Sequence, residues 1–122
     1  MPEYKPGVCN IGKNEIRKRY ALAVVAFVLS AIVSYATISL NLPKFALILT
    51  FIFLIIGFEG FYQGYFKFCT GFAAAGLSDF TGSRSKVTNS ESHKKDMKKA
   101  MNIHLCSIIS SIIVVTFIYF IL

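Results

Sequence analysis

Long apolar runs alternate with short polar segments along this sequence. The runs cover residues 20–40, 45–66 and 100–122, and Glu59 is the only Asp, Glu, Lys or Arg inside them. A run of about 20 apolar residues is what an α-helix needs to cross the ~30 Å hydrocarbon layer of a bilayer. The pattern therefore predicts an all-α membrane protein with three transmembrane helices.

The polar segments and the apolar runs fit a single transmembrane domain over residues 1–122. Residues 1–14 contain Pro and Gly and predict an irregular lead-in, whereas residues 77–99 predict an exposed, basic loop. We expect the second helix to continue past the membrane surface to about residue 76, because a helical pattern persists beyond residue 66. The alternative is a short interfacial helix after a break at Gly71.

Lysine and arginine are distributed unevenly between the two ends of the predicted bundle. Five lie in residues 1–19 and seven in residues 67–99, whereas only Lys44 lies in the short turn between the first two spans. By the positive-inside rule, the N-terminus and the long loop are cytoplasmic and the C-terminus is outside. The basic residues expected to face lipid head groups are Arg17, Lys18, Arg19, Lys94, Lys95, Lys98 and Lys99.

The net charge of +7 does not indicate a nucleic-acid partner, because no basic motif with interleaved aromatic residues stands apart from the spans. The expected partners are membrane lipids and other integral-membrane subunits. The sequence shows no nucleophile–base pair, phosphate-binding loop or paired carboxylates, so we predict no catalytic residue. We predict no cofactor either, and we expect bound lipid.

Small residues recur at helical spacing in each of the three spans. Lipid gives helices no hydrophobic reason to associate, so close backbone approach at small residues supplies the contact instead. The stripes expected to pack the helices are Gly57, Gly60 and Gly64 in the second span, Ser30 and Ser34 in the first, and Ser107 and Ser111 in the third.

Glu59 is the residue most out of place in its span. Counting from Phe66 puts it about 10 Å inside the membrane boundary, where an ionised side chain costs on the order of 3 kcal/mol. Tyr62 and Gln63 share its helix face. The favoured interpretation is structural, a protonated Glu59 hydrogen-bonded to a polar residue of the first span: Ser30, Ser34 or Tyr35. The functional alternatives are a buried contact to another subunit, which we prefer between the two, and a proton or cation site.

Three cysteines, Cys9, Cys69 and Cys106, fall on or near the predicted cytoplasmic side. With His104 they could supply thiolate and imidazole ligands to a metal, or Cys9 and Cys69 could form a redox pair. Unlinked thiols are the favoured interpretation, because the sequence has no C-x-x-C or H-x-x-x-H spacing and the cytoplasm is reducing. Since packed helices lie about 8–10 Å apart, we predict that the lead-in folds back and places the Cα atom of Cys9 within about 12 Å of that of Cys69.

Two motifs flank the first two spans. Residues 9–19 read Cys-Asn-Ile-Gly-x-x-Glu-Ile-x-x-Arg, and residues 68–80 read Phe-Cys-x-x-Phe-x-x-x-Gly-x-x-x-Phe. At these places relative to the spans, the motifs resemble those of a family of small prokaryotic multi-span membrane proteins of uncharacterised function. The resemblance implies a location in the prokaryotic cytoplasmic membrane, and it makes Cys9 and Cys69 recurring features of one surface. It implies no activity.

These observations predict a small accessory subunit of a larger integral-membrane complex, non-catalytic by itself. An oxidoreductase is the expected kind of complex, either a respiratory complex or a copper membrane monooxygenase. One alternative is a self-assembling channel or transporter-like protein that uses Glu59. Another is a thiol redox or metal-binding membrane protein that uses Cys9 and Cys69.

Overall fold

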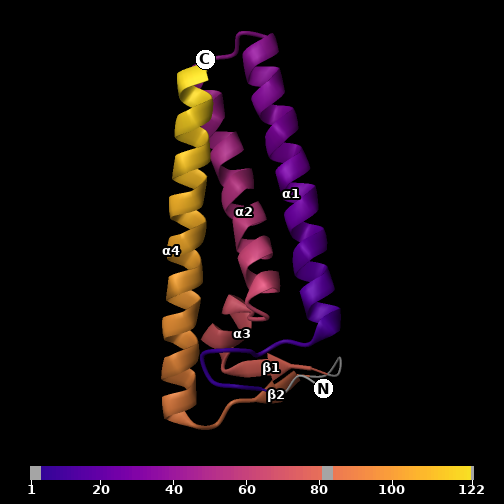
Figure 1. Cartoon of the computed structure of the whole chain (residues 1–122), viewed down its shortest axis with the longest axis vertical. Helices are drawn as coiled ribbons and strands as arrows, with labels where there is room; N and C mark the ends of the chain where they lie inside the picture. The colour runs from indigo at the N-terminus through magenta and orange to yellow at the C-terminus, as the bar shows by residue number, and fades with distance from the viewer. Residues whose placement is uncertain (1–3, 81–83, 122) are drawn as a thin grey trace.

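The computed structural model describes residues 4–80 and 84–121 and has long helices standing on a small sheet (Figure 1). The elements in chain order are α1 (Lys13–Ser39), the 3₁₀ helix η1 (Lys44–Ala46), α2 (Leu47–Tyr65), α3 (Thr70–Ala75), β1 (Leu77–Asp79), β2 (Arg84–Lys86) and α4 (Ser90–Ile121). In the described part of the chain, three helical segments are long and apolar enough to cross a membrane, namely α1, η1 continued by α2, and α4. Each predicted apolar run therefore forms such a helix.

The central helix of the bundle is α2, which packs against α1 on one side and α4 on the other. Over the described residues, α1 and α4 have few contacts with each other. The lead-in, α3 and the two strands gather at one end of the bundle, called here the sheet end (Figure 1). The connection from α1 to α2 and the last turns of α4 lie at the opposite end, called here the turn end.

The prediction that the second helix continues to about residue 76 is wrong, because α2 ends at Tyr65 and α3 is a separate helix. Lys67 has a left-handed backbone conformation with φ of 56°. Its N–H donates to the carbonyl of Gly64, and the N–H of Phe68 donates to the carbonyl of Gln63. These two bonds form a Schellman motif that closes the helix. The break therefore falls at Lys67, and not at Gly71 as in the alternative.

The small sheet corrects the predictions of an all-α fold and of an exposed loop over residues 77–99. Strands β1 and β2 pair antiparallel, with Leu77 opposite Lys86. The lead-in adds hydrogen bonds to β1, because the N–H of Gly12 donates to the carbonyl of Asp79 and the N–H of Asp79 donates to the carbonyl of Asn10. The side chain of Asp79 is buried, and α4 already begins at Ser90. The predicted loop is thus a folded cap on the bundle.

Glycines of α2 bring its backbone against α1. A Cβ atom added at Gly60 would lie 2.7 Å from the carbonyl oxygen of Arg19 and 3.1 Å from the backbone N of Ala23. At Gly57 it would lie 2.7 Å from the ring of Phe27, and at Gly64 it would lie 3.1 Å from the Tyr20 ring. The close contact between α1 and α2 therefore requires glycine at these positions. Small residues allow helices to approach closely in the same way in other membrane bundles.

Serines of the predicted stripes lie in the helix contacts, where they satisfy their own hydroxyls. Ser107 and Ser111 are fully buried on α4 and donate to carbonyls one turn back, as does Ser34 on α1. The Ser34 hydroxyl also lies 3.3 Å from that of Thr50 on α2. Ser30 is buried and donates to the carbonyl of Phe27. Each of these serine hydroxyls therefore has a hydrogen-bond partner.

Large apolar side chains cover the outer faces of the three long helices. On α4, Phe117 is 68% exposed and Phe120 79% exposed, and on α1 Val24 is 63% exposed. The buried apolar cluster is small and lies near the sheet end, where Phe68, Ala73, Ala100 and Ile103 pack together. An apolar exterior around small interior residues fits a bundle surrounded by lipid rather than water.

Candidate functional site

A groove of about 480 Å³ lies beside α2, near the sheet end, and contains Glu59. It opens between α1 and α4, whose walls contribute Leu22 and His104 respectively. The side towards the middle of the bundle is apolar and includes Ile55 and Ile56. The side towards the sheet end is polar and is lined by Arg19, Glu59, Gln63 and Thr70.

Glu59 is bonded through both carboxylate oxygens. Its Oε1 lies 2.6 Å from Nδ1 of His104 on α4, and its Oε2 accepts a hydrogen bond of 2.9 Å from Nε2 of Gln63. The Glu59 side chain is only 16% exposed, whereas that of His104 is 48% exposed. The favoured interpretation, in which Glu59 bonds Ser30, Ser34 or Tyr35, is therefore wrong. The partner comes from the opposite neighbouring helix.

Arg19 extends the network to α1. Its Nε donates to Oε1 of Gln63 at 3.2 Å, and one terminal nitrogen lies 2.9 Å from Sγ of Cys69. The other terminal nitrogen pairs with Glu15 at 3.2 Å. Although predicted to face lipid, Arg19 turns inward with a side chain 18% exposed. Lys18, Lys94, Lys95 and Lys98 are exposed, and Lys99 places Nζ 3.9 Å from the centre of the Phe66 ring.

Glu59 lies level with the start of the first span. The carbonyl oxygen of Arg19 would be 2.7 Å from a Cβ atom on Gly60, so the α1 backbone passes beside this turn of α2 at Arg19. Residue counting from Phe66 placed Glu59 about 10 Å inside the boundary. The contact with Arg19 instead puts Glu59 close to the last basic residue of α1, where the apolar run begins.

Tyr62 and Gln63 diverge, although sequence spacing put both on one face with Glu59. The hydroxyl of Tyr62 lies 2.7 Å from that of Ser110 on α4. Gln63 instead joins Glu59 and also donates to the hydroxyl of Thr70 at 3.2 Å. The polar patch of the sequence therefore divides between the groove and the α2–α4 contact.

The cysteines have separate environments. The buried thiol of Cys9 lies 3.5 Å from the carbonyl oxygen of Ile11, the buried Cys69 contacts Arg19, and Cys106 is exposed on α4. Burial raises the pKa of the Cys9 thiol above its ordinary value. Among the described residues, no three His, Cys, Asp or Glu side chains gather as a metal site, and the three cysteines are free thiols. A metal site that includes Cys9, Cys69 and either Cys106 or His104 is therefore not formed.

The two sequence motifs meet at the sheet end through Asn10. This side chain is fully buried, accepts a 2.7 Å hydrogen bond from the N–H of Cys69 and donates to the carbonyl of Cys69 at 3.1 Å. The backbone N–H of Asn10 donates to the carbonyl of Lys67. The lead-in thus folds back over the end of α2, with Cys9 next to this contact. The signal for Asn10 was its place between apolar Cys9 and Ile11, which sequence analysis overlooked.

Asp96 is a second buried polar residue that the sequence analysis missed. It is fully buried on α4, and it accepts hydrogen bonds of 2.5 Å from the Tyr4 hydroxyl and 2.8 Å from the N–H of Gly7. Burial and the carboxylate of Asp96 raise the pKa of Tyr4 above its ordinary value. An acid amid four lysines, in the stretch Lys94–Lys99, was the available signal.

The groove can hold and exchange a proton between a carboxylate and an imidazole, and it can pack an apolar side chain next to that pair. Nδ1 of His104 faces Glu59 and about half of the ring is exposed, so its other edge can meet a group that enters the groove. In comparisons with known proteins, no family model matches the chain, and no curated protein or solved structure matches it. The geometry of the site therefore carries the functional argument.

Proposed function

We propose that this protein is an accessory subunit of a larger integral-membrane complex, and that a helix of another subunit packs into the groove that contains Glu59. The observation that carries the proposal is the Glu59–His104 pair, which joins α2 to α4 inside a groove left open between α1 and α4. Among the functional interpretations of Glu59, sequence analysis preferred a subunit contact, and the groove supplies a surface for it.

The electrostatic environment of the pair favours a protein occupant. Polar groups that are taken out of water are costly unless they are hydrogen-bonded. Glu59 and His104 bond each other on the α2 side, but the His104 side chain is 48% exposed on the side of the opening. A partner helix would shield the pair, bond the exposed imidazole edge and pack on Leu22 and Ile56 along the apolar wall.

The direction of the network favours this proposal over a self-assembling channel. The chain of contacts runs from Glu15 and Arg19 on α1, through Gln63 and Glu59 on α2, to His104 on α4. It crosses the bundle near one end instead of following the helix axes. A lateral network suits a contact between helices, whereas a transport path needs polar groups along the membrane normal.

We also propose that the sheet end is cytoplasmic, in a prokaryotic cytoplasmic membrane. Twelve of the thirteen Lys and Arg residues lie in sequence segments 1–19 and 67–99, and Lys44 is the exception. Those segments contribute the lead-in, the cap and the first turns of α1 and α4, which meet at the sheet end. The positive-inside rule supports this orientation.

Site-directed photocrosslinking in native membranes tests the subunit contact. The full chain, expressed at its native abundance, carries a benzophenone amino acid in place of Leu22, which lines the groove. The matched control places it at Val24, which is exposed on α1 and does not line the groove. We expect a discrete adduct with one integral-membrane protein from position 22 only. Mass spectrometry then identifies the complex, for which the sequence predicts an oxidoreductase.

Substitution of the pair gives a second readout of the same contact. Glu59→Gln and His104→Ala should each reduce co-purification of the partner in mild detergent by about fivefold or more, as expected for central interface residues. Ser110→Ala, which alters the α2–α4 contact outside the groove, serves as the folding control. A chain that migrates alone from native membranes and forms no adduct at position 22 would contradict the proposal.

A further inference from the structure

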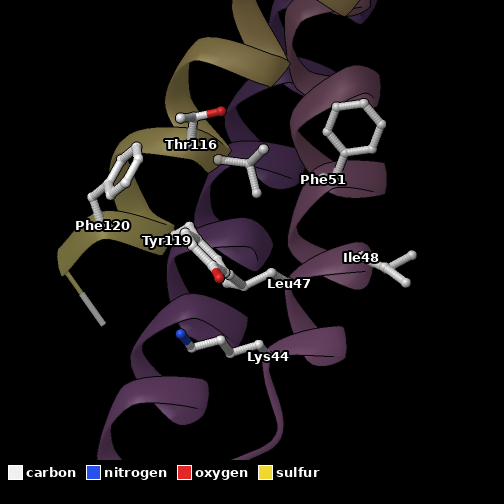
Figure 2. A pocket seen from close by; sticks show the side chains of 8 residues that line it. Lys44, Leu47, Ile48, Phe51, Thr116, Tyr119 and Phe120 are labelled. Carbon is white, nitrogen blue, oxygen red and sulfur yellow. The ribbon is translucent and has the colours of Figure 1, made fainter.

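We propose a binding site for an anionic phospholipid at the turn end, with the phosphate held by Lys44 and an acyl chain in the groove between α2 and α4. The site is separate from the groove that contains Glu59, and it does not depend on a partner subunit. Figure 2 shows the lining side chains from close by.

The groove is an apolar channel with one cation at its end. Its volume is about 420 Å³, within the usual range of small-molecule sites. Leu47, Ile48 and Phe51 line it from α2, whereas Val115 and Phe120 line it from α4. Phe51 is seven residues from Lys44, so the apolar wall extends roughly 10 Å along the helix axis from the cation. These dimensions suit an acyl segment that lies beneath a head group.

Lys44 is placed to meet a negative group at the end of the groove. Its Nζ lies 4.4 Å from the centre of the Tyr119 ring, and Figure 2 shows the side chain directed towards that ring. An aromatic face attracts an ammonium ion but leaves its N–H groups available to oxygen acceptors. The ring therefore orients the cation without neutralising it.

The charges near Lys44 favour an anion as the ligand. The sequence has no Asp or Glu between Glu15 and Glu59, and none after Asp96. The segments that line this groove, residues 44–51 and 115–120, therefore contain no Asp or Glu side chain to pair with Lys44. A lysine at the membrane surface attracts anionic lipid by about 1 kcal/mol. The combination of an apolar wall and a lysine whose lining segments contain no Asp or Glu fits a phospholipid better than a soluble anion or an apolar helix.

Brominated lipids test the site, because the sequence contains no tryptophan. Phe120→Trp puts a reporter on the groove, and Phe45→Trp puts one at the turn end outside it. Each full-length variant is reconstituted in vesicles of phosphatidylcholine with a minor fraction of phosphatidylglycerol, with bromine on one lipid or the other. We expect the groove reporter to show an apparent affinity about fivefold higher for brominated phosphatidylglycerol than for brominated phosphatidylcholine. The Phe45→Trp reporter should show little preference.

Charge variants in the Phe120→Trp background decide the role of the lysine. Lys44→Gln should abolish the fivefold preference, Lys44→Arg should keep it, and Lys94→Gln at the sheet end should leave it unchanged. A preference that survives Lys44→Gln, or one that is absent in the parent, would overturn the proposal. Inorganic phosphate is the competing soluble ligand. If phosphate added alone removes the preference at unchanged ionic strength, the site recognises free phosphate and the lipid assignment is wrong.

Discussion

Asn10 and Asp96 are buried polar side chains that attach the lead-in to the rest of the molecule. Each binds main-chain groups, since Asn10 pairs with both the N–H and the carbonyl of Cys69 and Asp96 accepts the N–H of Gly7. Buried main-chain groups need such partners, because an unpaired one costs about 1–3 kcal/mol. At this scale, stability of the sheet end rests on a few side chains whose loss leaves backbone groups unpaired.

Asn10→Ala should lower the free energy of unfolding by about 1–3 kcal/mol, because it leaves the buried N–H of Cys69 without a hydrogen-bond partner. Asn14→Ala, at an exposed position on α1, is the matched control and should change stability by less than about 0.5 kcal/mol. Unfolding in mixed detergent micelles, followed by circular dichroism, measures both variants. Equal effects of the two substitutions would contradict the structural role of Asn10.

Tyr4 makes the stability of the sheet end depend on alkaline pH. Its pKa is raised in the folded protein by burial and by Asp96, whereas an unfolded tyrosine titrates at about 10. The stabilisation by the protonated phenol is full below about pH 10 and is lost as pH rises through the folded-state pKa. Tyr4→Phe should therefore be less stable at neutral pH but should lose less stability between about pH 9 and pH 11.

The control for this pH dependence is Tyr35→Phe, because Tyr35 is 74% exposed on α1. It should follow the parent protein at every pH, and denaturation at a series of pH values makes the comparison. A Tyr4→Phe variant that loses stability as steeply as the parent above about pH 10 would show that this phenol does not control the alkaline transition.

At the scale of the elements, contact between α1 and α2 depends on glycine, whereas contact between α2 and α4 uses larger side chains. Gly60 admits the backbone of Arg19, and Gly57 admits the ring of Phe27. Across the other contact, Tyr62 reaches Ser110 and Glu59 reaches His104. The side of α2 that faces α1 is therefore approached more closely than the side that faces α4. It should be the more sensitive to substitution by a larger residue.

Gly60→Ala should destabilise the bundle by about 1–3 kcal/mol, the usual cost of overpacking. Its new methyl group would lie 2.7 Å from the carbonyl oxygen of Arg19, which is backbone and cannot rotate away. Gly71→Ala is the matched control, since the nearest atom to its methyl group is Sγ of Cys69 at 3.8 Å. Thermal denaturation in the same detergent compares them, and a Gly60→Ala variant as stable as Gly71→Ala would contradict the close contact with Arg19.

At the scale of the whole molecule, the cap joins all three long helices at one end, and the turn end has only a short connection. Strand β1 pairs with the lead-in before α1, α3 packs on α4, and α2 ends beneath Asn10. Basic residues share the end that carries this cap. The arrangement makes the two ends of the bundle distinct in both charge and structure, which allows the orientation to be tested directly.

Labelling of one introduced, exposed cysteine, with Cys9 and Cys69 left buried, should report the two ends from opposite sides of the membrane. Thr88→Cys lies at an exposed position of the sheet end and Leu40→Cys at an exposed position of the turn end, both introduced with Cys106→Ala. In intact cells, an impermeant maleimide should label the Leu40→Cys variant only. In inside-out vesicles it should label the Thr88→Cys variant only. Labelling of both from the same side would contradict the orientation.

The sequence alone determined the three long helices and the hairpin connection. These follow from apolar run length and from a short polar turn, both of which are local properties of the chain. The helix spacing of Gly57, Gly60 and Gly64 also indicated a close contact, because a stripe of small residues on one face has a direct packing consequence. The uneven distribution of Lys and Arg between the two ends of the bundle could likewise be predicted from the sequence alone.

Tertiary structure decided the rest, because it depends on groups far apart in the chain. Helix α2 ends at Tyr65 and is closed by Lys67, a residue type that does not signal a left-handed cap, where the lead-in supplies Asn10 as a partner. The three-residue pairing of β1 with β2 is too short to leave a pattern in the sequence. Glu59 bonds His104, which lies 45 residues later in the sequence, and no spacing rule within one helix could have identified that partner.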